Sequence, residues 1–365
     1  MASLAVAVLG AGGTIAPAIV RDLAASDEVE SLFLLDLDQQ RAASVADQHG
    51  AGKAAARAVD AGDAEALAGA LQGVNVLVNS ASYRINLDAM RACLQARCHY
   101  LDLGGLYWLT KKQLELGAEF ERAGLLAILG IGSSPGKTNL MAVRGVRELG
   151  GEEVEKIEVI AAGRDLAEAD DGRLRPPYAL QTLIDELTLS PVVLRGGRAA
   201  EIEPLTPGGT EDFGEPIGSA ETIYTLHSEL ATFGESFGCR EASFRLSLSP
   251  ALLPRLEELA HASDEGRAAA AREAARPSAQ TVSVHLVRLT GSAGGTVLVR
   301  ALTEPWAGLG GGIVSTATPA AAAVRLLARG SVTGRGALPP ERCLEPDEMF
   351  AELEARGCRF SVSTG

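Results

Sequence analysis

The chain has 365 residues, of which 33 are basic and 47 acidic, and its formal net charge is −14. With 47% hydrophobic and 22% charged residues it has the composition of a folded globular protein, and its length favours about two domains. The negative charge argues against nucleic acid and anionic membranes as partners, since both repel an acidic surface. It is compatible with a cationic or zwitterionic small-molecule substrate.

Cysteine usage and hydropathy bear on the compartment. The five cysteines include no Cys-x-x-Cys pair and are odd in number, so we expect neither a disulfide framework nor a metal site. Reduced thiols favour a cytoplasmic protein. The chain enters a predicted strand directly after Ser3, without the pattern of a signal peptide. We find no uncharged apolar run of about 18 residues, so no transmembrane helix is expected.

The first 130 residues alternate short apolar runs with amphipathic stretches. Strands are predicted at 4–9, 31–35, 58–60, 74–79, 99–103 and 125–129. Helices are predicted at 16–25, 38–48, 63–72, 86–97 and 110–123. Apolar strands separated by helices predict an α/β fold, in which helices cover both faces of a doubly wound, Rossmann-type parallel sheet.

The pattern changes after about residue 150, where long crossover helices become scarcer. Strands are predicted at 154–162, 241–248, 281–289 and 296–302, and helices at 263–276, 320–328 and 346–356. An antiparallel sheet with few helices would make this region an α+β domain. We therefore divide the chain into a first domain at 1–135, an inserted substrate and dimerisation domain at 136–304, and a C-terminal segment at 305–365 that returns to the first domain.

The strongest chemical signal is the segment Gly10-Ala-Gly12-Gly13-Thr14-Ile15, which follows a strand and opens a helix. This context is what a dinucleotide fingerprint requires. Gly10 would permit a tight turn, Gly12 would let the backbone approach a pyrophosphate, and the amides at the helix start would face its charge. Ile15 occupies the third glycine position, where a branched side chain should push the helix away from the strand.

Acidic and polar residues at later strand ends complete the predicted cofactor site. Asp36 lies 24 residues after Gly12, and its carboxylate would accept hydrogen bonds from the ribose hydroxyls and repel a 2′-phosphate, which favours NAD over NADP. Asp60 would approach the adenine, and Asn79-Ser80-Ala81 would lie beside the binding crevice. The alternative is that the glycines only shape a turn and that Asp36 is a solvated cap.

Two further segments lie where ligands of open α/β sheets bind. Asp102 ends a strand, and its carboxylate would hold a substrate ammonium or orient a water; alternatively it is a turn or N-cap aspartate. In the loop from Gly132 to Gly136, the free amides near Pro135 would touch the nicotinamide or a substrate carboxylate. The alternative here is a plain strand-to-helix connection.

His227 is the best candidate for proton transfer. An imidazole titrates near pKa ~6.5, which suits a base at neutral pH, and Glu229 lies two residues away. A histidine at a helix end is the alternative interpretation. The other four histidines lie on charged helices, at a strand start or within an alternating strand: His49, His261, His99 and His285.

Tyr178 follows two prolines and would bind or flank a substrate amine, with Asp185 or Glu186 on the same face of the next helix. An ordinary half-buried tyrosine and a solvated helical face are the alternatives. An arginine should clamp an amino-acid carboxylate. Five candidates are Arg164, Arg173, Arg175, Arg240 and Arg245.

The order of the motifs resembles the saccharopine reductase and lysine 6-dehydrogenase family of amino-acid dehydrogenases. The segments that carry this resemblance are Gly10–Ile15, Tyr83–Asn86, Tyr100–Gly105, Gly130–Asn139, Pro176–Tyr178, His227–Glu229 with Thr232, and the tail from Gly330 to Glu341. The resemblance implies a split Rossmann domain, an inserted α+β substrate domain, chemistry at an amine carbon and a homodimer. Ser134 stands where the saccharopine-forming branch more often has an acid, which favours the lysine 6-dehydrogenase branch.

The sequence therefore predicts an NAD-dependent enzyme that oxidises the side-chain amine of L-lysine or a close diamine. His227 would be the base, and Asp102 and Glu229 would bind the ammonium group. One alternative is a saccharopine-type reductase that joins an aldehyde to an amino acid. The other, of a different class, is a non-catalytic nucleotide-sensing protein.

Overall fold

The computed structural model describes residues 3–167, 174–176, 178, 180–249, 252–274 and 278–365. The chain forms two compact units: unit 1 comprises Met1–Leu140 and Thr316–Leu353, and unit 2 comprises Met141–Ser315 and Glu354–Gly365. The predicted boundaries at 135 and 304 differ from these. The chain crosses between the units inside α7 (Lys137–Glu148), inside α12 (Gly311–Arg329) and at the end of α13 (Pro346–Glu354).

Unit 1 contains a seven-stranded sheet with the order β15-β6-β5-β4-β1-β2-β3, and every pair in it is parallel. The strands are β1 (Leu4–Leu9), β2 (Val29–Asp36), β3 (Ala54–Ala58), β4 (Val76–Asn79), β5 (His99–Asp102), β6 (Leu126–Ile128) and β15 (Gly336–Leu338). The order 3-2-1-4-5-6 is that of a Rossmann sheet, and the predicted fold class is confirmed. It places the switch point between β1 and β4.

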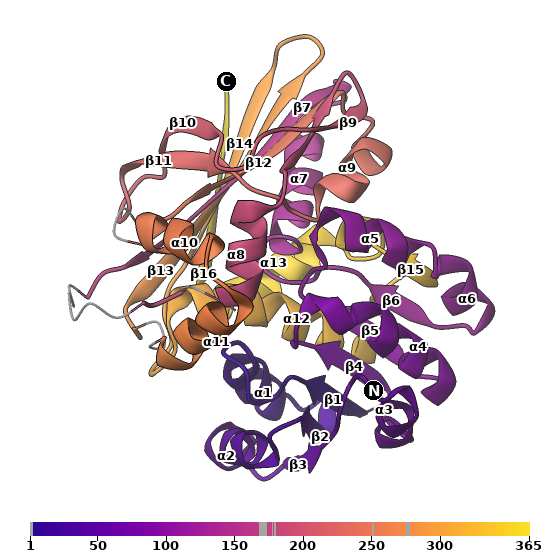
Figure 1. Ribbon diagram of the computed structural model, residues 1–365. Coiled ribbons are helices and arrows are strands. Elements are labelled where there is room, and N and C mark those ends of the chain that lie inside the picture. The colour runs from indigo at the N-terminus through magenta and orange to yellow at the C-terminus, as the bar shows by residue number, and fades with distance from the viewer. Residues whose placement is uncertain (1–2, 168–173, 177, 179, 250–251, 275–277) are drawn as a thin grey trace. The chain divides into compact units, whose positions relative to one another are not determined.

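Helices cover both faces of this sheet (Figure 1). They are α1 (Ala16–Ala24), α2 (Gln39–His49), α3 (Ala64–Ala70), α4 (Asn86–Ala96), α5 (Leu106–Leu114), α6 (Gly117–Arg122) and α13 (Pro346–Glu354), with 3-10 turns η1 (Tyr83–Ile85) and η2 (Pro340–Arg342). Side chains on both sides of β1, such as Ala7 and Val8, are fully buried. Continuous apolar runs therefore form these strands because both faces are covered.

Three predicted elements of unit 1 and the tail need correction. The single helix expected at 110–123 is two helices, α5 and α6, which break at 115–116. The strand expected at 58–60 ends at Ala58, so Asp60 lies in the following loop. The helix expected to begin after Pro319 begins at Gly311 and contains Pro319, because apolar packing along its length outweighs the lost hydrogen bond.

Unit 2 contains a nine-stranded sheet with the order β10-β11-β12-β7-β13-β14-β16, to which β8 and β9 add at β12. The strands are β7 (Val154–Asp165), β8 (Val192–Arg195), β9 (Arg198–Glu201), β10 (Pro207–Asp212), β11 (Ser219–Tyr224), β12 (Glu241–Ser247), β13 (Thr281–Gly291), β14 (Thr296–Thr303) and β16 (Cys358–Thr364). The helices of this unit are α8 (Leu180–Thr188), α9 (Leu230–Phe237), α10 (Leu253–Ala260) and α11 (Asp264–Glu273). The sheet is mixed rather than antiparallel, because β12 pairs with β7 in parallel.

The tail divides between the two units. Strand β15 pairs with β6 in unit 1, as the returning segment was expected to do. Strand β16 instead pairs with β14 in unit 2, which corrects the expectation that all of 305–365 belongs to the first domain. The last strand covers an edge of the second sheet that would otherwise expose unpaired backbone groups.

Helix α12 is long and apolar enough, by length and composition, to cross a membrane. It contains Arg325, so it is not an uncharged apolar run of the kind considered in the sequence analysis. Moreover, 78% of its apolar window is buried inside the protein, and the core helix of a folded domain has the same properties.

Candidate active site

The glycine loop and Asp36 form one hydrogen-bonded unit at the carboxyl end of the parallel strands. The Gly12 amide donates to Oδ2 of Asp36 over 2.8 Å, and the Asp38 amide donates to Oδ1 over 2.9 Å. Gly10 has a φ of +75°, and a Cβ there would lie 2.6 Å from the Cα of Ala81. Only glycine fits this turn, which brings the end of β1 against the end of β4.

The start of α1 has the free donors that a dinucleotide phosphate needs. The helix begins at Ala16, and within the described chain the amides of Thr14 and Ile15 have no hydrogen-bond acceptor. Unpaired amides at a helix start attract phosphate groups. Ile15 is buried, and Gly13 donates its amide to the Gly10 carbonyl over 2.9 Å. The loop thus fits a dinucleotide, although its third glycine is absent.

The other predicted cofactor residues of the first four strands gather at the same edge. Ser80 donates both its amide and its hydroxyl to the Leu9 carbonyl, and the Ala81 amide donates to Oδ1 of Asn79. Asn79 is buried and serves to shape this turn. Asp60 is exposed, and its carboxylate accepts the Gly62 amide over 2.8 Å.

Asp102 is enclosed by protein donors. Its Oδ1 accepts the amides of Gly104 and Gly130 over 3.0 and 2.7 Å, and its Oδ2 accepts the side-chain amides of Asn86 and Gln113 over 3.1 and 2.6 Å. Burial raises the pKa of Asp102, although the bonds from Gln113 and Gly130 oppose this change. A carboxylate has about four lone-pair sites, and all four are used. The geometry argues against the predicted contact with a substrate ammonium and favours a structural role.

The loop before α7 is tightly tied to itself. The Gly132 amide donates to the Pro135 carbonyl over 2.9 Å, and the Lys137 amide donates to the Gly132 carbonyl over 2.9 Å. Pro135 is buried, and the helix begins two residues later at Lys137. The Gly136 amide donates to Oδ1 of Asn139. This loop lies at the carboxyl end of β6, the edge to which the predicted cofactor site belongs.

Unit 2 contains a buried acid–histidine cluster. Nδ1 of His227 lies 2.5 Å from Oε2 of Glu229, and Nε2 lies 3.9 Å from Oε1 of Glu186. The other oxygen of Glu186 accepts a hydrogen bond from the Tyr178 hydroxyl. The imidazole stacks on Phe244, with ring centres 3.6 Å apart and planes inclined by 20°. His227, Glu186 and Glu229 are respectively 7%, 4% and 1% exposed.

Burial and mutual charge shift the pKa values in this cluster. Burial raises the pKa of Glu186 to about 7, which His227 and Tyr178 oppose and Glu229 assists. Burial acts to lower the pKa of His227, but the charge and hydrogen bond of Glu229 together with the charge of Glu186 outweigh it, so the pKa rises. Burial and Glu186 raise the pKa of Tyr178 well above its usual value. The imidazole therefore keeps its proton to higher pH than a free histidine does.

The stability of the protein should fall as the pH rises from about 5 to 8. Glu186 ionises near 4.5 when unfolded but near 7 when folded, so the unfolded chain binds fewer protons across this window. The stability that the raised pKa of His227 contributes is present below about 6.5 and is lost as the pH rises through the folded value. Thermal denaturation should show a weaker pH dependence in Glu186→Gln than in the wild type, whereas Asp185→Asn should retain most of it. Equal slopes in Glu186→Gln and the wild type would contradict this expectation.

The structure unites residues that the sequence left as alternatives. Tyr178 and Glu186 do share one site, whereas Asp185 accepts a hydrogen bond from Gln181 instead. Phe244 was not predicted, because its role depends on strand β12 lying against the segment that carries His227. Helix α8 is amphipathic, and Glu186 lies beside apolar residues of its buried face. An acid in such a position was the sequence signal that could have identified Glu186 as a site residue. Pro177 lies outside the described residues.

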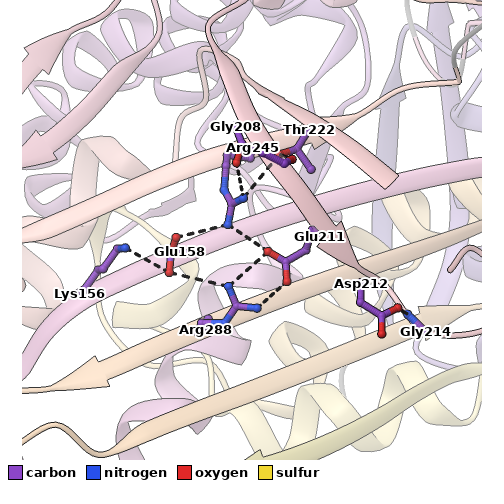
Figure 2. A network of polar contacts seen from close by, with 10 residues as sticks. Lys156, Glu158, Gly208, Glu211, Asp212, Gly214, Thr222, Arg245 and Arg288 are labelled. Carbon is purple, nitrogen blue, oxygen red and sulfur yellow. Dashed lines mark hydrogen bonds and ion pairs between the residues drawn. The ribbon is translucent and has the colours of Figure 1, made fainter. Parts of the chain in front are cut away.

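Arg245 is engaged in another network, shown in Figure 2. Its guanidinium donates to the Gly208 carbonyl over 2.8 Å and contacts Glu158 and Glu211 at 3.3 and 3.2 Å. Consecutive residues of a strand point to opposite faces, so Arg245 projects from the sheet face opposite to that of Phe244. It is therefore unsuited to clamp a substrate beside His227.

The remaining candidate arginines differ in whether protein groups already bind their side chains. Arg164 donates to Oγ of Ser247 over 2.8 Å, and Arg240 is a largely exposed partner of Glu155. Arg173 lies outside the described residues. Arg175 is half-buried and lies three positions before Tyr178, so it stays a prediction.

Comparison with known proteins agrees with this geometry. Residues 6–128 match the family model described as the saccharopine dehydrogenase NADP binding domain. A stretch of 133 residues is 30% identical to carboxynorspermidine synthase of Vibrio alginolyticus and covers 33% of the chain and 31% of that protein. The match thus spans about a third of the curated relative's length.

Two solved structures share the fold over the whole chain. Saccharopine dehydrogenase (L-Glu forming) of Saccharomyces cerevisiae has a TM-score of 0.73 at 15% identity, with 100% of both chains covered. Homospermidine synthase of Legionella pneumophila, in complex with NAD, has a TM-score of 0.71 at 11% identity, with 100% of this chain and 92% of that one covered. Fold and glycine loop define an α/β protein with a nicotinamide-dinucleotide domain. Residues 6–128 thus carry a domain of the saccharopine dehydrogenase NADP binding type, and the two solved structures show the fold of the whole chain.

Proposed function

We propose that the protein is an NAD-dependent oxidoreductase that oxidises the side-chain amine of an amino acid, with L-lysine as the first candidate. The observation that carries this proposal is the buried cluster of Tyr178, Glu186, His227 and Glu229, which offers proton-transfer groups and negative charge for an amine. The dinucleotide loop of unit 1 supplies the second requirement. The match of residues 6–128 to a saccharopine dehydrogenase NADP binding domain supports this second requirement.

The proposed reaction is R–CH2–NH3⁺ + NAD⁺ + H2O → R–CHO + NH4⁺ + NADH + H⁺. The amine must first lose a proton, because a protonated nitrogen has no lone pair to assist departure of hydride from the adjacent carbon. The acid–histidine cluster provides the acceptor for this proton. When bound, the nicotinamide dinucleotide takes the hydride. Residues Gly10–Ile15 and Asp36 would hold it.

Asp36→Ser should shift cofactor preference from NAD toward NADP. In the proposed complex the carboxylate accepts the ribose hydroxyls and repels a 2′-phosphate, and serine keeps a hydrogen-bonding group without the charge. We would measure Kd for both dinucleotides by calorimetry. Asp60→Ser is a matched control on the same sheet edge and should change the ratio of the two affinities less. An unchanged ratio in Asp36→Ser would remove Asp36 from cofactor selection.

A second candidate is a saccharopine-type reductase that joins an aldehyde to an amine and reduces the resulting imine. The similarity to carboxynorspermidine synthase over 133 residues favours this candidate. This reaction also needs the dinucleotide loop and the acid–histidine cluster. Here the cluster would give a proton to the amine that forms, whereas in the oxidation it would accept one. Only the direction and the substrates distinguish it from the first.

The deciding experiment measures NADH formation from NAD with L-lysine, ornithine, other diamines and saccharopine, with NADP in parallel. Turnover with lysine alone supports the first candidate. Turnover with saccharopine alone, or NADH consumption with an aldehyde and an amino acid, supports the second. Binding of NAD without turnover of any of these compounds would instead support a nucleotide-sensing protein.

We further propose that the enzyme acts as a homodimer in the cytoplasm on a small amine, and binds neither nucleic acid nor membranes. The net charge of −14 supports the absence of nucleic-acid and membrane partners, and the free cysteines support a cytoplasmic location. Light scattering after gel filtration tests the oligomeric state; a monomer at working concentration would contradict it.

A further inference from the structure

The His227 ring is enclosed by two acids and an aromatic ring. Each ring nitrogen faces a carboxylate, Glu229 at Nδ1 and Glu186 at Nε2, and Phe244 covers one face of the ring. The ring is 7% exposed. An imidazole between two buried acids is most stable with both nitrogens protonated, because two unpaired buried carboxylates would otherwise face each other.

Glu186 connects this cation to the outer part of the cluster. Its Oε2 accepts the Tyr178 hydroxyl, while its Oε1 faces Nε2 of His227 at 3.9 Å, beyond the reach of a direct hydrogen bond. The charged or titratable groups that face it are Tyr178, Asp185, His227 and Glu229. Tyr178 is the more exposed end of the chain Tyr178–Glu186–His227–Glu229. A proton from a ligand would therefore be transferred first to the Tyr178 oxygen, while the Tyr178 hydroxyl proton passes to Glu186.

We infer that Glu186 accepts the proton of the substrate amine through the hydroxyl of Tyr178, and that His227 with Glu229 is a fixed cation that positions Glu186. This inference rests on the proposed amine oxidation. It reassigns the base from His227, the residue the sequence favours, to an acid on α8.

The proton step balances without a further reactant. An N–H bond of R–CH2–NH3⁺ breaks as its proton passes to the Tyr178 oxygen, and the Tyr178 hydroxyl proton passes to the Glu186 carboxylate. The products are R–CH2–NH2 and a neutral Glu186, and this step involves no oxidation or reduction. With a pKa of about 7, Glu186 can take up and release this proton near neutral pH.

The first test locates the proton without any substrate. Infrared pH-difference spectra of the full chain should show a carboxylic acid band that titrates near neutral pH. The band should be absent from Glu186→Gln and present in Asp185→Asn, a buried neighbour that bonds to Gln181. Nitrogen NMR should show both His227 nitrogens protonated through this titration, with His227→Gln used for assignment. Persistence of the band in Glu186→Gln, or loss of the imidazole proton in its place, would overturn the inference.

The second test follows the pH dependence of turnover with L-lysine, or with whichever amine of the panel yields NADH. In the wild type, kcat/KM should rise with pH as Glu186 loses its proton. Glu186→Gln should lower kcat by about 10²–10⁴ and abolish this rise, while the Kd for NAD stays unchanged. Tyr178→Phe should lower kcat but keep the rise, and Asp185→Asn should shift the rise to lower pH, because the charge of Asp185 helps to raise the pKa of Glu186.

The two tests separate the inference from the function on which it rests. If no amine yields NADH, the proposed oxidation fails, and the spectra still decide whether Glu186 or His227 exchanges the proton. If an amine is oxidised but Glu186→Gln keeps the wild-type rate and pH profile, the inference fails alone.

Discussion

Asp102→Ala should lower the free energy of unfolding by about 3–5 kcal/mol. The substitution removes the acceptor of two backbone amides and of the side chains of Asn86 and Gln113, of which Asn86 keeps the Gly104 carbonyl as another acceptor. These donors come from different segments around β5, so their loss should loosen the loops at the dinucleotide edge of unit 1. Denaturant unfolding followed by circular dichroism measures this effect.

Asp102→Asn is the matched control, because it keeps the shape of the side chain and, through its amide oxygen, an acceptor for the amides of Gly104 and Gly130. It should therefore cost clearly less than Asp102→Ala. If Asp102→Ala instead kept wild-type stability and lost only turnover, Asp102 would be restored as the substrate-binding residue that the sequence predicts.

His227→Gln should lower kcat by about 10²–10⁴ at neutral pH and leave the Kd for NAD intact. Glutamine removes the charge between Glu186 and Glu229, so the pKa of Glu186 should rise further and its carboxylate should be scarce at pH 7. Stopped-flow measurement of NADH formation checks the rate, and calorimetry checks cofactor binding.

The pH profile of this variant separates two mechanisms. If His227 positions Glu186, activity should recover partly as the pH is raised and Glu186 ionises. If His227 is itself the base, the loss should persist at every pH. Near-normal turnover at pH 7 would remove His227 from both.

The nucleotide half of the protein could be predicted because its signals are local. The glycine loop and Asp36 each follow a strand directly, and parallel strands of a Rossmann sheet end at one edge. The bond between Gly12 and Asp36 is the direct result of β1 and β2 being neighbours. Asp60 was harder to place, because the strand before it is short and half-exposed.

The role of Asp102 could not be predicted from the sequence around it. From its position alone, a carboxylate at a strand end beside two glycines is typical of a ligand-binding residue. Its partners Asn86, Gln113 and Gly130 come from two helices and the end of another strand, and only packing brings them to one point. Whether an acid is free for a ligand depends on how many donors surround it, which is a property of the folded chain.

The sequence by itself determined the fold class and the dinucleotide motif, because periodicity and glycine positions act over a few residues. Tertiary structure alone decided the proton chemistry. In the folded chain His227 stacks on Phe244, Glu186 accepts a hydrogen bond from Tyr178, and Arg245 projects from the opposite face of the sheet. The physical reason is that a pKa depends on burial and on neighbouring charges, and those neighbours meet only when α8, β12 and the segment before α9 pack together.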